Sequence, residues 1–358
     1  MADTTTEKPA FLLPAKRSFS PGPLGHGASI FQFDAQQLRD DVSVPTLIGA
    51  VASATGAPLG NREFDTLSVL ARWYFDGLEA AERHARRDAL RNGATPEEAD
   101  RAGERARDEA AANRWIESTM HQLSMAIYDG KSRERYQALG RALENLARVT
   151  VSLPGFDAET GELDPHALSM VHLVSAIVVT DKQREIAWAR KNAEGDLARI
   201  TGSAKGQVTL KVQLDEWMVN AILRRSGHHL NFAVQRALGG HAKSLWIQLE
   251  ALGFTPIGDD IEQYELPLTP DTFASLEINA TRQADKVRKV RDRLDAIIAE
   301  DPAYLDYEVT RDPNDRRRAH SIVVRRCTGD LLQQRLREQL IRQRRGAEQL
   351  ILTVREAA

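Results

Sequence analysis

The stretch from Thr281 to Arg326, TRQADKVRKVRDRLDAIIAEDPAYLDYEVTRDPNDRRRAHSIVVRR, carries the pattern that predicts the fold. Its first part predicts an amphipathic helix that ends at Asp301-Pro302, because a residue before proline is disfavoured in the helical conformation. The segments YLDYEVT (304–310) and SIVVRR (321–326) then favour two strands, joined by the polar loop RDPNDRRR (311–318). The expected buried stripe of the helix consists of aliphatic residues: Val287, Val290, Leu294, Ile297 and Ile298.

Basic residues occupy a second face of this predicted helix. Successive members are four, three and four residues apart, which places them on one side of a helix. A cationic helix followed by a hairpin with an arginine-rich tip can hold DNA, with the helix in the major groove and the hairpin on the adjacent backbone. The alternative is a solvated helix face beside an ordinary hairpin, and this stretch alone leaves both open. The residues of the face are Arg282, Lys286, Lys289 and Arg293, with Arg288 and Arg291 further round the helix.

Composition limits the class of protein and the kind of site. The 358 residues suffice for two domains plus tails, and the net charge of −3 means that any DNA-binding charge must be concentrated locally. The single cysteine, Cys327, excludes an internal disulfide, and no Cys/His cluster has the spacing of zinc ligands. No apolar run is long enough for a secretory signal or a membrane span, so we expect a cytoplasmic protein without a membrane partner.

The chain before residue 207 predicts a tail and a first domain. Residues 1–28 are rich in Thr, Pro, Gly and Ser and predict a disordered, flexible N-terminal tail. The first domain, 29–206, has its first strong helix from Asn61 and a charged helical insertion at 79–112. Within the insertion, Thr95-Pro96 predicts a capped helix start. The poor apolar seam of the insertion favours a solvated excursion over a coiled-coil partner surface.

The rest of the first domain predicts a mixed series of elements. Residues 115–128 favour a strand and a short helix, and residues 129–153 favour a loop, a basic helix and a strand. A further apolar strand region follows at 168–180, and the charged segment 181–206 predicts a loop excursion. The order is therefore helix, short helix, basic helix and hairpin.

The same order recurs in the predicted second domain, 207–328. A strand and helix at 207–223 and a helix at 232–254 precede a short helix, the basic helix and the hairpin described above. Residues 329–358 are predicted to form a C-terminal helical tail. The repeated order predicts an α+β fold, mainly helical, built of two tandem winged-helix domains.

The sequence lacks the motifs of common enzymes. The glycine-rich piece GSAKGQ (202–207) lacks the GKS or GKT ending that holds phosphate and magnesium. The pair His228-His229 is followed by leucine and does not form a metal motif. The acids lie mostly opposite bases on helix faces, which is typical of a solvated surface. We therefore expect no enzyme activity, no cofactor and no metal.

Four pieces of the chain, within residues 60 to 327, resemble the replication initiator proteins of iteron-type plasmids. These pieces are REFDTLSVLARWYF, RYQALGRALENLARVTVSL, HAKSLWIQLEALGF and RQADKVRKVRDRLDAIIAEDPAYLDYEV. The resemblance is one of pattern and order. The insertion at 79–112 and the excursion at 181–206 depart from it.

The resemblance implies two winged-helix domains that bind repeated double-stranded origin DNA. It implies that the helix at 281–298 is a recognition helix and that the wing contacts phosphate or the minor groove. It also implies host replication initiator and helicase proteins as partners, and a homodimer through the first domain. The implied wing residues are Arg316, Arg317 and Arg318, and the implied DNA-binding residues of the first domain are Lys131, Arg133, Arg135 and Arg141.

Three function classes are compatible with these patterns. The first is a plasmid replication initiator that binds its origin sequence-specifically, promotes its opening and recruits host replication proteins. The second is a winged-helix transcriptional regulator or repressor without a role in replication. The third is an interaction protein whose charged helices bind other proteins.

Overall fold

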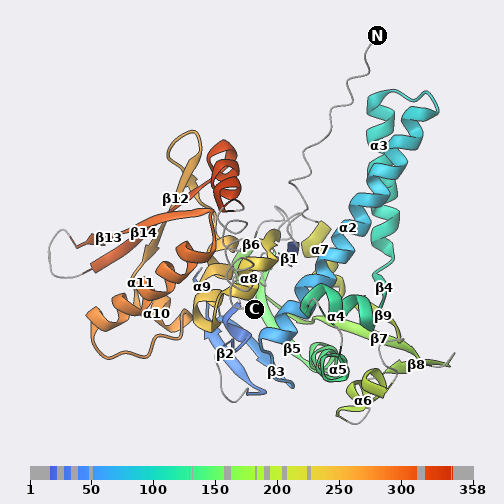
Figure 1. Cartoon of the computed structure of the whole chain (residues 1–358), viewed down its shortest axis with the longest axis horizontal. Helices are drawn as coiled ribbons and strands as arrows, with labels where there is room; N and C mark the ends of the chain where they lie inside the picture. Colours follow the sequence, from blue (N-terminus) through green and yellow to red (C-terminus); the bar gives the residue numbers. More distant parts are fainter. Residues whose placement is uncertain are drawn as a thin grey trace, which may run out of the picture. The chain divides into compact units, whose positions relative to one another are not determined.

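The computed structural model describes residues 17–21, 28–33, 39–47, 51–128, 130, 132–156, 163–181, 184–188, 194–203, 208–223, 227–312, 319–339 and 341. The chain divides into two compact units, residues 1–236 (unit 1) and residues 237–358 (unit 2). Their helices and strands are labelled in Figure 1. Each unit combines helices with antiparallel sheets, which confirms the predicted α+β class.

Unit 2 has the topology of a winged helix. Its first strand lies between its first and second helices, and its third helix leads into a hairpin. The four strands pair antiparallel in the order β11-β12-β14-β13, so the last strand lies between the other two long ones. The elements are α9 (Gly240–Ala251), β11 (Thr255–Pro256), β12 (Ile261–Pro267), α10 (Pro270–Ser275), α11 (Gln283–Glu300), β13 (Tyr304–Arg311) and β14 (Ala319–Cys327), and residues 329–339 are helical.

The core of unit 2 lies where α9 and α11 pack against each other. Trp246 of α9 is 1% exposed, and its indole Nε1 donates a hydrogen bond of 2.8 Å to Asp301, the residue that caps the C-terminus of α11. The predicted stripe of α11 is confirmed at three positions and is only half-buried at Val287 and Ile298. The three fully buried positions are Val290, Leu294 and Ile297.

Unit 1 repeats this topology with additional elements inserted. The series β4, α4, α5, β7 and β9 corresponds to the winged helix of unit 2, with other elements between its members, and the strands of this sheet pair antiparallel in the order β4-β9-β7-β8. The last strand of the set, β9, again lies between the other two. The elements are α2 (Asn61–Arg91), α3 (Pro96–Ala112), β4 (Trp115–Thr119), α4 (Met120–Tyr128), α5 (Arg133–Arg148), β7 (Val174–Asp181), β8 (Arg184–Trp188) and β9 (Thr209–Leu214).

The position of β9 corrects the predicted domain boundary. The sequence placed residues 207–223 at the start of the second domain, but β9 pairs with β4 and β7 and completes the sheet of unit 1. Helix α7 (Glu216–Leu223) and helix α8 (Phe232–Ala237) come after it in the chain, and the units divide between Arg236 and Ala237. The boundary at 206 is therefore wrong. A strand followed by a helix can close one domain or open the next, and only its pairing partners decide which.

The predicted hairpin after the basic helix of unit 1 belongs to a separate sheet. Strand β5 (Thr150–Phe156) pairs with β6 (Leu163–His172), and both join β2 (Val42–Pro45) and β3 (Val51–Thr55) in the order β2-β3-β5-β6. The strands equivalent to the wing of unit 2 are instead β7 and β9. An extra hairpin is thus inserted between α5 and the wing strands of unit 1.

Two segments predicted to lack regular structure contain elements. Residues 1–28 were expected to be a flexible tail, but β1 (Arg17–Pro21) pairs with β10 (Gly227–Asn231), and a short 3-10 helix covers Ala28–Ile30. The expected loop at 181–206 contains β8 and helix α6 (Asp196–Ser203). Helix α6 packs on α5. The carboxylate of Glu144 accepts hydrogen bonds from the backbone N–H groups of Gly195 (2.9 Å) and Leu197 (2.5 Å) at its start.

The charged insertion at 79–112 is a helical hairpin, as predicted. Helix α3 runs beside the second half of α2 (Figure 1). Thr95 forms a capping box with Glu98: Thr95 N donates to the carboxylate at 2.8 Å, and Glu98 N donates to the Thr95 hydroxyl at 3.3 Å. The buried Arg107 donates to Glu82 of α2 at 2.9 Å, so the pairing of the two helices relies on a salt bridge as well as on small residues.

Candidate nucleic-acid interface

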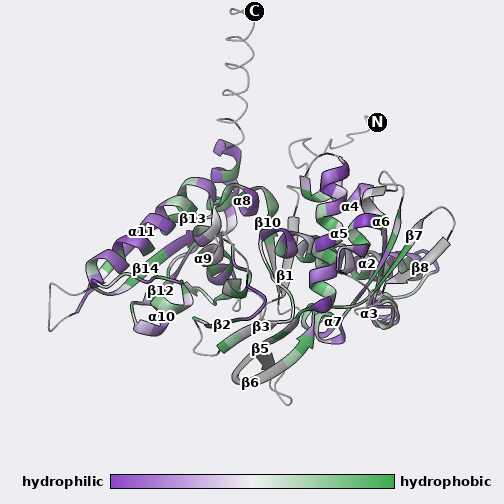
Figure 2. Ribbon diagram, turned by 90° about the horizontal axis from the view of Figure 1, so that it is seen from below, coloured by the Kyte–Doolittle hydropathy of each residue, from purple (hydrophilic) through white to green (hydrophobic). Residues whose placement is uncertain are grey.

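The N-terminal half of α11 concentrates positive charge. Residues 282–289 contain four basic residues and one acid, and Arg282 is the N-cap of the helix. Arg282 and Lys289 are exposed, and within the described residues neither side chain has a hydrogen bond or an ion pair. Lys286 is half-buried, with its ammonium group 5.1 Å from the centre of the Phe273 ring of α10. Figure 2 shows α11 as a mainly hydrophilic helix.

Arg293 does not share this exposed surface. Its side chain is 8% exposed, and its guanidinium Nη1 donates a hydrogen bond of 2.5 Å to the backbone carbonyl of Leu276. The prediction that Arg293 faces a DNA groove is therefore wrong. Residues 290, 293, 294 and 297 have the spacing of one helix face, so this signal could have assigned Arg293 to the buried stripe.

Replacing Arg293 with alanine is expected to destabilise unit 2 rather than relax base specificity. The variant loses a charge-assisted hydrogen bond and leaves the Leu276 carbonyl without that donor, which costs about 1.5–3 kcal/mol. Urea denaturation measures this loss. Arg288→Ala is the control on the same helix, at an exposed position, and should change the unfolding free energy by about 0.5 kcal/mol or less. Equal stability of the two variants would contradict the assignment.

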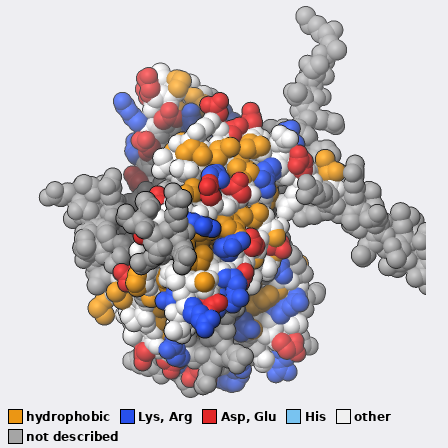
Figure 3. All heavy atoms as spheres, turned by 90° about the vertical axis from the view of Figure 1, so that its left-hand side faces the viewer, with side chains coloured by type: hydrophobic (Ala, Val, Ile, Leu, Met, Phe, Trp, Pro, Cys, Tyr) orange, Lys and Arg blue, Asp and Glu red, His pale blue; other side chains and the backbone are white. Residues whose placement is uncertain are grey.

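The exposed face of α11 carries both basic and acidic side chains. Arg288 forms an ion pair of 3.2 Å with Asp285, one turn earlier on the same helix. Arg291 Nε donates to the hydroxyl of Tyr307 on β13 at 3.3 Å, and that hydroxyl donates to Asp295 at 2.9 Å. On the side of the molecule that Figure 3 shows, Lys and Arg side chains lie among Asp and Glu side chains. The exposed basic side chains that have neither a hydrogen bond nor an ion pair among the described residues, those of Arg282 and Lys289, lie in the N-terminal half of the helix.

The wing strands pair most of their described arginines with acids. Arg325 of β14 forms ion pairs with Asp306 (3.1 Å) and Glu308 (2.8 Å) of β13, and Arg326 bonds to Glu262 of β12. The predicted wing-tip residues Arg316, Arg317 and Arg318 fall in the segment that joins β13 to β14 and lie outside the described residues. Their contact with DNA stays a prediction.

Helix α5 of unit 1 holds the place that α11 holds in unit 2, after a short helix and before the wing strands. Ser132 caps it by accepting a hydrogen bond of 3.2 Å from the backbone N–H of Arg135. Arg133, Arg135 and Arg141 are exposed, and the guanidinium of Arg135 lies 5.6 Å from the centre of the Tyr128 ring. The predicted site residue Lys131 lies outside the described residues.

A group of titratable side chains lies where α9 meets the sheet of unit 2. Glu250 is 18% exposed, accepts a hydrogen bond of 2.7 Å from the Tyr304 hydroxyl, and lies 3.6 Å from Arg326. Burial raises the pKa of Glu250 to about 6, against the opposing effect of the Arg326 charge. Burial also raises the pKa of Asp301, although Trp246 donates a hydrogen bond to it.

The raised pKa of Glu250 gives unit 2 a pH-dependent stability. The folded state binds more protons than the unfolded state between pH 4.5 and 6, so this contribution is full below pH 4.5 and is lost as pH rises through 6. The unfolding free energy lost in this way is about 2 kcal/mol. The Glu250→Gln variant has no carboxyl group at this position to titrate. As pH rises from 4.5 to 7.5, the wild type should therefore lose about this amount of unfolding free energy relative to the variant. Urea titrations across this pH range measure the unfolding free energies of the variant and the wild type. Glu300→Gln, at an exposed position, is the control. A difference between Glu250→Gln and the wild type that does not change with pH would contradict the assignment.

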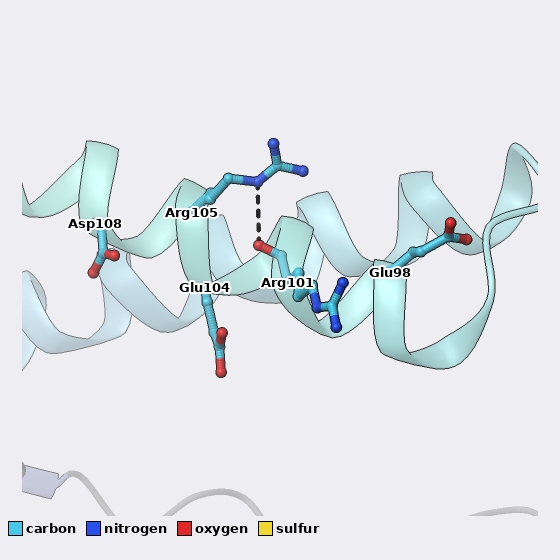
Figure 4. Close-up of a pocket in the computed structure, with 5 residues that line it drawn as sticks. All are labelled: Glu98, Arg101, Glu104, Arg105 and Asp108. Carbon is cyan, nitrogen blue, oxygen red and sulfur yellow. Dashed lines mark hydrogen bonds between the residues drawn. The ribbon is translucent and has the colours of Figure 1, made fainter.

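Other kinds of site find no support in the part of the chain that the structure describes. There, no group of three His, Cys, Asp or Glu side chains is arranged to hold a metal ion. None of the described helices combines the length and apolar character that a membrane span needs. A shallow depression on α3 is lined by Glu98, Arg101, Glu104, Arg105 and Asp108, and Arg105 Nε donates to the Arg101 carbonyl within it (Figure 4). Its mixed charges are those of a solvated helix surface.

Comparisons with known proteins give a small number of similar structures. No family model matches the chain, and no curated protein matches it. The chain is similar to domains 2 and 3 of RctB, with 7% identity over 86% of this chain and 98% of that one and a TM-score of 0.44. It is also similar to the Pi initiator protein, solved in complex with iteron DNA, with 12% identity over 61% of this chain and 82% of that one and a TM-score of 0.37. Since both TM-scores are below 0.5, the winged-helix assignment rests on the strand order of the two units.

Proposed function

We propose that this protein binds double-stranded origin DNA sequence-specifically through its two winged-helix units and acts as a plasmid replication initiator. The observation that carries the proposal is the repeated topology, in which each unit presents exposed basic residues on the helix before its wing strands. Such a helix fits the major groove, and the neighbouring hairpin then lies against the backbone. Two such units in one chain cover a longer site than one.

Among the described residues, the proposed interface consists of exposed or half-exposed basic side chains, and Lys131 and the wing tip join it as predictions from the sequence. In unit 2 they are Arg282, Arg288 and Lys289, with Lys286 at the edge and the wing tip beyond β13. In unit 1 they are the exposed arginines of α5 and Lys131 before it. Arginine supplies bidentate contacts to guanine or phosphate, and lysine supplies a point charge for the backbone. The protein carries no catalytic activity in this proposal.

Footprinting of the purified full chain on DNA that flanks its own gene tests the proposal. We expect protection of directly repeated sites of about 20 base pairs, roughly two helical turns, beside an AT-rich stretch. Protection of a single inverted repeat over the promoter would instead favour the alternative, a transcriptional regulator without a replication role. Absence of any protected site at moderate salt would contradict both.

The finer parts of the proposal concern the assembly of the protein and the events at the origin after DNA binding. We propose that the bound protein promotes origin opening in the cytoplasm, recruits the host replication initiator and helicase, and forms a homodimer through unit 1. Permanganate reactivity of the AT-rich stretch measures opening, and light scattering of the free and DNA-bound protein measures the dimer. Pull-down with the purified host proteins measures recruitment. Each measurement can fail without affecting DNA binding itself.

A further inference from the structure

Arg291 lies at the junction of α11 and the wing. It is exposed on α11, and its Nε donates to the hydroxyl of Tyr307, which stands on the neighbouring strand β13 (Figure 1). That hydroxyl in turn donates to Asp295, one turn further along α11. The Tyr307 proton is therefore directed at Asp295, and the lone pairs of the Tyr307 oxygen are left for Arg291. These two hydrogen bonds fix the direction of the Arg291 side chain.

The partner of Arg291 differs from those of the neighbouring arginines. Arg288, Arg325 and Arg326 each form an ion pair with at least one carboxylate. Within the described residues Arg291 has no ion pair, and its hydrogen-bond partner is a neutral phenol. Its charge is therefore held in place without a direct ion pair, and the carboxylates of Asp292 and Asp295 act on it only from a greater distance. Because only Nε is engaged, both terminal nitrogens keep their donors for a bidentate contact with an anion.

We propose that Arg291 contacts a backbone phosphate of bound DNA at the junction of α11 and the wing, and that Tyr307 positions it. The inference deepens the proposed function and rests on it. A helix in the major groove and a hairpin beside it straddle one sugar-phosphate strand, which places a phosphate near this junction. An arginine already held in one orientation loses less conformational entropy when it makes that contact.

The salt dependence of binding tests the contact. Fluorescence anisotropy of a labelled origin fragment, measured from 50 to 300 mM salt, gives the slope of log K against log salt. Arg291→Ala should reduce the slope by about 0.9 and the affinity by about eightfold at 0.1 M salt, which is the effect of one phosphate contact. Arg291→Gln keeps a hydrogen-bond donor for Tyr307 but lacks the charge, so its slope should equal that of Arg291→Ala. Arg337→Ala, at an exposed arginine of the helix at 329–339, removes the same charge elsewhere and should leave the slope unchanged.

A double-mutant cycle tests the positioning role of Tyr307. Tyr307→Phe keeps the charge of Arg291 but removes its hydrogen-bond partner, so affinity should fall two- to fivefold in the wild-type background and stay unchanged in the Arg291→Ala background. An equal loss in both backgrounds would overturn the positioning role. A wild-type slope in both Arg291 variants would overturn the phosphate contact. If the wild-type protein itself shows no salt-dependent DNA binding, the proposed function fails as well.

Discussion

A chain in which Arg282 and Lys289 are both replaced by alanine is expected to bind its DNA site about 60-fold more weakly than the wild type in 0.1 M salt. Each of these exposed side chains would contact one phosphate, and each such contact contributes about 0.9 to the slope of log K against log salt. The slope should therefore fall by about 1.8. Fluorescence anisotropy between 50 and 300 mM salt measures both quantities.

The matched control for this variant removes two charges elsewhere. Arg101 and Arg105 are exposed on α3, so Arg101→Ala with Arg105→Ala changes the net charge equally without touching α11 (Figure 4). Its slope should match that of the wild type. An equal loss of slope in both double variants would show that only the overall charge matters, and would contradict the placement of the interface on α11. Unfolding curves of both variants should coincide with the wild type, because the replaced side chains are exposed.

Replacing Trp246 with alanine is expected to destabilise unit 2 by about 3–5 kcal/mol. The side chain is 1% exposed, so its removal opens a cavity between α9 and α11 that its neighbours fill only in part. The change also removes the donor of the 2.8 Å hydrogen bond to Asp301, a carboxylate that is itself buried. Hydrogen exchange followed by mass spectrometry measures the loss of protection over α9 and α11. Peptides from unit 1 serve as the internal reference.

Trp246→Phe separates the two contributions. Phenylalanine fills most of the volume but lacks the indole N–H, so we expect a loss of about 1–3 kcal/mol, the cost of an unsatisfied buried acceptor. A loss below about 1 kcal/mol in the alanine variant would mean that Trp246 does not anchor the core. Since α11 carries the proposed interface, the alanine variant should also lose DNA affinity as unit 2 unfolds.

Much of the local structure could be predicted from the sequence because it depends on neighbouring residues. The helix that ends at Asp301-Pro302, the two strands after it and the capped start at Thr95-Pro96 all depend on periodicity or on backbone preferences within a few positions. The exposure of Arg282 and Lys289 is explained by the same periodicity. Arg293 departs from the prediction because its place beside Val290, Leu294 and Ile297 puts it on the buried face of the helix despite its charge.

The sequence by itself determined the series of a helix, a short helix and a basic helix in each half, and hence the repeat that predicts two winged helices. Only the tertiary structure decided that β9 completes the sheet of unit 1, because strand pairing joins β9 to β4 across nearly a hundred residues. Tertiary structure also decided that Arg291 meets Tyr307, since that contact depends on how α11 packs beside β13. Periodicity and caps act over one or two turns, whereas pairing partners and side-chain contacts between elements depend on the packing of the whole unit.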